Sequence, residues 1–170
     1  MRAALFLLAA LAACSGEPLQ SDWERKHLSE IAPEVAAPPP RYPRAGDLVA
    51  VDVPAPSGVR FFVDATTLSV GTDRVVRYVL VGRSASGIDN VTFEGLRCSP
   101  REFRVYALGR PDRSWGGSPG PWQTTRAADV SPARRALAED YFCADGLPVR
   151  DAGEAVAALH RAPRARQIAD

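Results

Sequence analysis

Between residues 48 and 108, short segments of alternating apolar and polar side chains restrict the possible fold more than any other feature. In the clearest segment, residues 75–82, Val76, Tyr78 and Leu80 alternate with Arg77 and Val79. A period of two is typical of β-strands, and turn signals recur about every 8–12 residues. These patterns predict an antiparallel meander of about six strands, at residues 48–53, 60–64, 68–70, 75–82, 91–98 and 101–108.

Two helices are predicted after the strands. Ser131 followed by Pro132 is a typical helix start, with Ser at the cap and Pro at the first helical position, and this helix should run to about residue 142. A second helix is expected between a capping Asp151 and His160, whereas residues 110–130, rich in Pro and Gly, should form a loop. The chain is therefore predicted to have an α+β fold, with about six antiparallel strands followed by two C-terminal helices packed on the sheet.

The first fourteen residues resemble the export signal of a bacterial lipoprotein. Arg2 precedes an apolar run that is too short to cross a bilayer, which needs about 20 residues, and the run ends in Leu11-Ala12-Ala13-Cys14. This ending is similar to the lipobox that lipoprotein signal peptidase recognises. The resemblance implies that residues 1–13 are removed and that Cys14 carries acyl chains. The alternatives are an ordinary cleaved signal with an unmodified Cys, or a buried helix.

This leader sets the expected location and the role of the segment that follows it. The lipobox resemblance implies a lipid-anchored protein of the cell envelope that faces the periplasm, and Ser15 favours the outer membrane over the inner one. Residues 14–45 are predicted to form a tether, with a short helix at 22–31 and a Pro-rich linker that holds an extended form. This linker could hold the domain off the membrane or be a poorly ordered arm. One α+β domain is expected at 46–161 and a frayed tail at 162–170.

The three cysteines predict one disulfide. An odd cysteine count in an exported protein needs an explanation, and lipidation of Cys14 supplies one. Cys98 and Cys143 then remain as a pair in an oxidising compartment, where disulfides persist. The alternative is that both are unpaired buried thiols. Because His27 and His160 are the only histidines and neither lies near a cysteine in sequence, no metal or other cofactor is expected.

Charge restricts the partners. The formal net charge is +1 at pH 7, so the whole chain has no general attraction to nucleic acid. The expected partners are the membrane, through acyl chains on Cys14, and a protein or polymer of the envelope.

Several sequence blocks together resemble one protein family. The chain is similar to the CNP-like family of small exported proteins of Gram-negative bacteria over roughly Tyr42 to Leu159. The resemblance implies no established activity, ligand or catalytic residue. The matching blocks are residues 60–64, 68–71, 75–78, 83–87, 90–98 and 141–143.

Three groups of residues are candidates for function, each with a structural alternative. Trp115 and Trp122, in the 110–130 loop, could bind a partner or fold back as lids on the helices. Carboxylates of the sheet could act as a catalytic pair, although Glu94 is expected to form a cross-strand ion pair with Arg77, Arg83 or Arg97. Arginines along the strands could bind phosphate or carboxylate groups, or form a solvated face balanced by acids. The carboxylates are Asp64, Asp73, Asp89 and Glu94, and the arginines are Arg60, Arg77, Arg83, Arg97, Arg101 and Arg104.

Two hypotheses for function follow from these candidates. The leading hypothesis is a non-enzymatic, membrane-tethered periplasmic module with a structural or partner-binding role, and it has no catalytic residues. The second hypothesis is a small envelope hydrolase or lyase that uses carboxylates of the sheet. A pocket with convergent titratable groups would favour the enzyme, whereas a filled core with an exposed Trp and Arg surface would favour the binding module.

Overall fold

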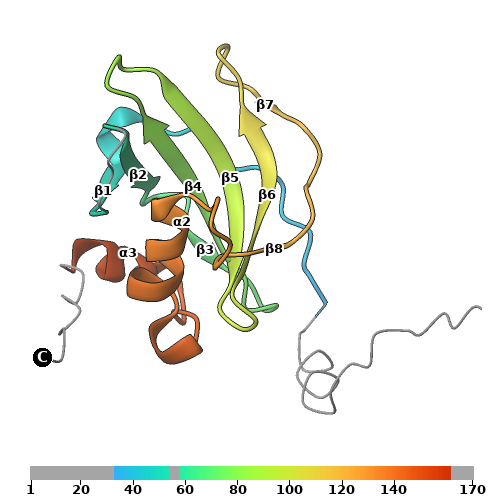
Figure 1. The fold of residues 1–170 in the computed structure, drawn as a ribbon. Helices are drawn as coiled ribbons and strands as arrows, with labels where there is room; N and C mark the ends of the chain where they lie inside the picture. Colours follow the sequence, from blue (N-terminus) through green and yellow to red (C-terminus); the bar gives the residue numbers. More distant parts are fainter. Residues whose placement is uncertain (1–32, 54–57, 162–170) are drawn as a thin grey trace, which may run out of the picture. The chain divides into compact units, whose positions relative to one another are not determined.

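The computed structural model describes residues 33–53 and 58–161. The predicted signal segment with Cys14, the predicted helix at 22–31 and the tail at 162–170 lie outside the described residues. Six strands follow one another across an antiparallel sheet in the order β1-β2-β4-β5-β6-β7 (Figure 1). The predicted antiparallel meander is confirmed, except that its third strand, β3, lies outside this order and pairs with β4, and that β7 was not predicted. The strands are β1 (Leu48–Val51), β2 (Arg60–Asp64), β3 (Ser69–Val70), β4 (Val76–Arg83), β5 (Asp89–Arg97), β6 (Glu102–Gly109), β7 (Trp115–Gly116) and β8 (Gln123–Thr124).

Strand β4 lies in the middle of the sheet and is buried on both faces. Val76, Tyr78 and Leu80 point into the core beneath the helices. Val79 and Val81 point into a second apolar layer on the opposite face. This two-sided burial agrees with the predicted alternation, in which both sets of positions are mostly apolar. The central pair, β4 and β5, is therefore fixed from both sides and holds its side chains in defined directions.

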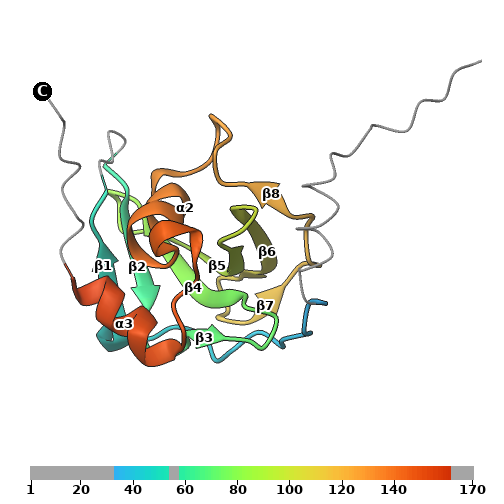
Figure 2. The same cartoon turned by 90° about the horizontal axis from the view of Figure 1, so that it is seen from below.

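The helices cover one face of the sheet (Figure 2). Helix α2 (Pro132–Ala136) begins at Ser131, whose side chain accepts a hydrogen bond from the backbone N–H of Arg134 at 3.4 Å, and continues as a π-helical turn, η2 (Leu137–Tyr141). Helix α3 (Ala152–His160) begins at Asp151, whose carboxylate accepts from the backbone N–H of Glu154 at 2.8 Å. Both predicted caps are confirmed. In the described part of the chain, no helix is long and apolar enough to cross a membrane.

The disulfide joins the end of β5 to the segment after η2. Cys98 and Cys143 are bonded, and their Cα atoms lie 5.2 Å apart. Both side chains are buried in the core between the sheet and the helices. The structure confirms the predicted bond, which links the fifth predicted strand to the first C-terminal helical segment.

Two segments cover the opposite face of the sheet: one precedes β1 and the other follows β6. Residues 33–44, which the sequence analysis placed in the tether, contact this face, and so does the segment that follows β6 (Figures 1 and 2). We call residues 33–44 the N-terminal arm. The buried residues of this face are Val79, Val81, Val91, Phe93 and Ala107, and those packed on them include Ala37, Tyr42 and Trp115.

The segment predicted as a loop, residues 110–130, contains two short strands that the sequence analysis missed. Strand β7 pairs with the end of β6, and β8 pairs with its beginning. Each strand has only two residues and lies among Gly and Pro residues, so neither carries a readable alternation. Between them, the backbone N–H of Gly120 donates to the carbonyl of Val105 at 2.9 Å. The outer edge of β6 is therefore partly covered by this segment.

Candidate functional site

The buried carboxylate Glu94 is held by a helix rather than by a neighbouring strand. Its side chain is 0% exposed and accepts hydrogen bonds from Arg134 Nη2 at 2.7 Å and from Tyr78 Oη at 3.1 Å. Thr92 Oγ1 also donates to it, at 2.5 Å. The guanidinium of Arg134 in turn lies 4.7 Å from the ring centre of Phe103. Glu94 is thus a fully bonded structural group at the contact between β5 and α2.

The predicted cross-strand partners of Glu94 are therefore wrong. Glu94 is paired in register with Tyr78, and both point toward the helices. Arg77, Arg83 and Arg97 stand at strand positions whose side chains point to the other face. Successive side chains of a strand alternate between the faces, so none of the three can reach Glu94.

On the face away from the helices, a buried ion pair holds the N-terminal arm. Asp73 accepts from Arg77 Nη2 at 2.5 Å and from the backbone N–H of Val35 at 2.7 Å, and Arg77 Nη2 donates to the carbonyl of Val35 at 2.7 Å. Burial opposes ionisation of Asp73, but the hydrogen bonds from Arg77, Val35 and Val75 outweigh it and lower the pKa of the carboxyl group. The pair is charged and binds both backbone groups of Val35, so it positions the arm.

Both tryptophans are half-buried and use their indole N–H groups within the domain. Trp115 Nε1 donates to the carbonyl of Pro40 at 2.7 Å, and its ring centre lies 5.3 Å from that of Tyr42. Trp122 Nε1 donates to Glu34 at 3.1 Å, and the guanidinium of Arg97 lies 4.1 Å from the ring centre of Trp122. The alternative that they form lids on the helices is wrong, because both contact the arm on the opposite face. A partner-binding role for their exposed edges stays a prediction.

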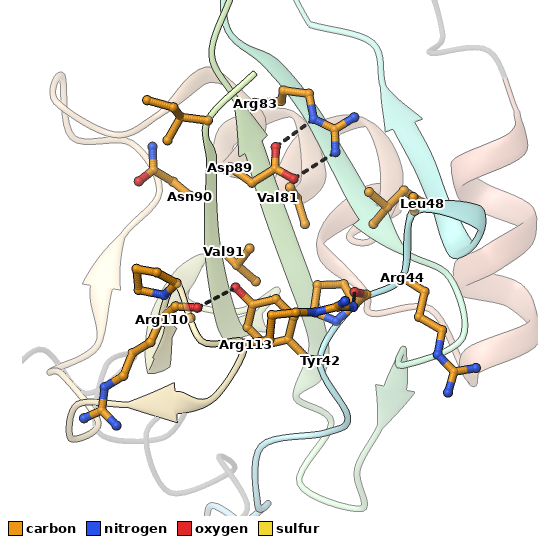
Figure 3. A pocket seen from close by; sticks show the side chains of 15 residues that line it. Tyr42, Arg44, Leu48, Val81, Arg83, Asp89, Asn90, Val91, Arg110 and Arg113 are labelled. Carbon is orange, nitrogen blue, oxygen red and sulfur yellow. Dashed lines mark hydrogen bonds and ion pairs between the residues drawn. The ribbon is translucent and has the colours of Figure 1, made fainter. Parts of the chain in front are cut away.

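A groove of about 670 Å³ opens on the same face, beside the arm. Figure 3 shows Val81 of β4 and Val91 of β5 at its centre, with Tyr42 and Leu48 along the side formed by the arm and β1. The turn after β6 supplies a further wall, and the hairpin between β4 and β5 supplies the exposed side chain of Ile88. The groove thus has an apolar floor built by the central strands and walls built by segments far apart in the chain.

The lining of the groove contains four guanidinium groups and one carboxylate. Arg83 binds Asp89 through two parallel hydrogen bonds of 2.7 and 2.8 Å, and the hydrogen bonds from Arg83 lower the pKa of the Asp89 carboxyl. Arg44, Arg110 and Arg113 have no carboxylate within ion-pair distance in the described part of the chain. The groove therefore has an excess of positive charge.

Two of the remaining groove arginines, Arg110 and Arg113, bind backbone carbonyls, and the side chain of Arg44 has no hydrogen bond to another described residue. Arg110 Nη1 donates to the carbonyl of Trp115 at 3.3 Å, and Arg113 Nη2 donates to that of Pro43 at 3.4 Å. The Arg113 guanidinium also lies 5.7 Å from the ring centre of Tyr42. Figure 3 shows the side chains of Arg44 and Arg110 extending outward from the rim of the groove. Carbonyl contacts leave the full positive charge of each guanidinium in place.

The predicted stripe of arginines is largely neutralised, and the groove arginines are mostly different residues. Four of its six arginines lie within ion-pair distance of an acid: Arg77 of Asp73, Arg83 of Asp89, and Arg97 and Arg104 of Glu34. Most of these arginines are therefore balanced by acids, as the structural alternative to a binding stripe predicted. Sequence analysis missed three groove residues, which lie in the arm and in a turn rather than in a strand: Arg44, Arg110 and Arg113.

The four candidate carboxylates lie in separate ion pairs rather than in one cluster. Asp64 lies 3.5 Å from Arg41 and also accepts from Thr66, so each of the four candidate carboxylates has a basic partner. Among residues 33–53 and 58–161, no group of three or more His, Cys, Asp or Glu side chains could hold a metal ion. The one open basic feature described above is the groove.

Comparison with known proteins gives a family. No curated protein and no solved structure matches the chain. The model of the CNP1-like family matches residues 29–160, which is most of the chain and includes the arm, the sheet and both C-terminal helices. The match agrees with the resemblance seen in the sequence blocks of the strands. The chain belongs to the CNP1-like family.

Proposed function

We propose that this chain is a non-enzymatic binding module of the bacterial cell envelope, anchored by acyl chains on Cys14 and facing the periplasm. The lipobox resemblance supports the anchor, and Ser15 favours the outer membrane over the inner one. A disulfide in the core suits an oxidising compartment such as the periplasm. The partner is a protein or polymer of the envelope, or the membrane itself.

The observation that carries the binding role is the contrast between the carboxylates and the groove. Asp64, Asp73, Asp89 and Glu94 each have an arginine partner. A general acid or base needs a pKa near the working pH, whereas the hydrogen bonds from the arginine partners lower the pKa of the Asp73 and Asp89 carboxyls. The groove, by contrast, offers basic groups without acidic partners around an apolar floor. This arrangement favours binding over the alternative hydrolase or lyase.

The anchor can be tested by replacing the lipid acceptor. Cys14→Ser is expected to abolish incorporation of radiolabelled palmitate, because the cysteine sulfur is the atom to which the lipid would be attached. The expected product is an uncleaved precursor in the envelope without lipid label. Cys98→Ser is the matched control for loss of a cysteine and should retain the label. Unchanged labelling of the Cys14 variant would contradict the lipoprotein assignment.

The location of the binding surface can be tested by crosslinking in cells. A photo-crosslinking amino acid at Ile88, which lines the groove and is 65% exposed, is expected to capture a component of the envelope. The matched control is the same amino acid at Leu147, which is 62% exposed and follows η3 (Ala144–Gly146). Equal capture from both positions, or capture from Leu147 alone, would count against the groove.

A further inference from the structure

The charge of the groove extends beyond its lining. Arg60 stands directly opposite Arg83 in the register of β2 and β4. Both guanidiniums flank the ring of Phe62, at 5.7 and 5.2 Å from its centre. Like charges directly opposite each other in a sheet are destabilising, and Asp89 pairs with Arg83. An added anion would therefore be attracted both by the groove and by this adjoining edge.

The turn after β6 fixes the backbone of two groove arginines. The backbone N–H of Arg113 donates to the carbonyl of Arg110, and that of Arg110 donates to the carbonyl of Ser114, both at 2.9 Å. Arg113 has φ +64°, a left-handed conformation that is uncommon for a residue with a side chain. Asp112 of the same turn accepts from the backbone and the hydroxyl of Ser114. The hydrogen bonds from Ser114 and the charge of Arg110 lower the pKa of the Asp112 carboxyl. The turn places both of its arginines at the rim of the groove.

Size and polarity indicate what can fit. A volume of about 670 Å³ lies in the usual range for small-molecule sites, roughly 300–1,000 Å³, and exceeds the needs of an inorganic anion. The floor is apolar at Val81 and Val91. A phosphate group offers three acceptor oxygens and up to about two negative charges, and guanidiniums bind it through paired hydrogen bonds. A carboxylate carries one charge and would leave much of this excess unmatched.

We infer that the groove is a binding site for a phosphate-bearing ligand, held by Arg44, Arg110 and Arg113 with its uncharged portion on the floor. This inference rests on the proposed binding function and specifies the chemistry of the ligand. The phosphate can come from the headgroup of an anionic membrane lipid or from a soluble phosphate compound. Both sources place the same group against the same arginines, and experiment can separate them.

Calorimetry with pyrophosphate tests the site. The full-length chain in neutral detergent is expected to bind pyrophosphate. Arg44→Gln/Arg110→Gln/Arg113→Gln should weaken binding about tenfold or more, since it removes the charge-assisted hydrogen bonds to the phosphate groups. The matched control, Arg74→Gln/Arg126→Gln/Arg161→Gln, removes the same charge from exposed residues outside the groove and should bind like the unmodified chain. Arg44→Gln alone removes no side-chain bond among the described residues and should also weaken binding.

A competition arm distinguishes the two sources. Phosphatidic acid added to the micelles should reduce the affinity for pyrophosphate if the site takes lipid headgroups, whereas phosphatidylcholine should not. Unchanged affinity with both lipids would assign the site to soluble phosphate compounds. Absence of pyrophosphate binding, or equal loss in the control triple variant, would overturn the inference. Capture from Ile88 together with absent pyrophosphate binding would retain the binding groove and reject phosphate as its ligand.

Discussion

Arg134→Met is expected to lower the free energy of unfolding by about 3–5 kcal/mol, because it leaves the carboxylate of Glu94 buried without its cation. Glu94 is 0% exposed, and the guanidinium of Arg134 supplies its strongest bonds. Met retains much of the aliphatic part of the side chain that covers Phe103. The lost stability therefore comes from removal of the charge rather than from a new cavity. Urea unfolding followed by circular dichroism measures the change. Helix α2 should detach from β5 first, since this pair joins them.

Two controls separate the ion pair from general damage to the helix. Arg135→Met changes the next residue, whose guanidinium donates to the carbonyl of Ala127, and should lower the free energy of unfolding by about 1 kcal/mol. The double variant Glu94→Gln/Arg134→Met removes both charges and should recover most of the lost stability. A loss of less than about 1 kcal/mol in Arg134→Met would contradict a structural role for the pair.

The strands and the faces of the sheet were predictable because each depends on local alternation. The alternation in residues 75–82 correctly assigned Val76, Tyr78 and Leu80 to one face and Val79 and Val81 to the other. The same rule, applied across the strands, would have placed Glu94 on the face away from Arg77, Arg83 and Arg97. Residues on neighbouring strands can pair through their side chains only when both side chains point to the same face of the sheet. The identity of Arg134 as the partner needed the docked position of α2, which no local pattern specifies.

The groove was not predictable because backbone groups hold its walls. The arm is held through the carbonyl of Pro40 by Trp115 and through both backbone groups of Val35 by Asp73 and Arg77. Any residue carries such backbone groups, so these contacts leave no residue-specific signal in the arm. As a result, Arg44 of the arm lines the same groove as Arg110 and Arg113, although the arm and the turn after β6 lie far apart in the chain. In the 110–130 segment, the composition draws attention to Trp115 and Trp122, whose partner-binding role stays a prediction, and not to Arg110 and Arg113, which line the groove.

Loss of the Cys98–Cys143 bond is expected to lower the thermal midpoint by about 10–20 °C. The bond spans 45 residues, for which chain-entropy estimates give roughly 4 kcal/mol, chiefly by restricting the unfolded chain. For a domain of this size, each kcal/mol corresponds to roughly 2–6 °C. Calorimetric melting of Cys98→Ala/Cys143→Ala against the unmodified chain measures the change. Adding dithiothreitol should shift the unmodified chain to the same midpoint and leave the double variant unchanged.

The bond and the ion pair join the same two segments, so their effects should depend on each other. Glu94 lies on β5 and Cys98 directly follows it, whereas their partners Arg134 and Cys143 lie within α2 and shortly after η2. With the bond intact, a detached helix stays close to the sheet and can dock again. Arg134→Met should therefore cost more in the cysteine-free background, by about 0.5–3 kcal/mol, the usual range for contacts that share a structural unit. If the losses of stability caused by Arg134→Met and by removal of the disulfide simply add, the ion pair and the bond stabilise the domain independently of each other.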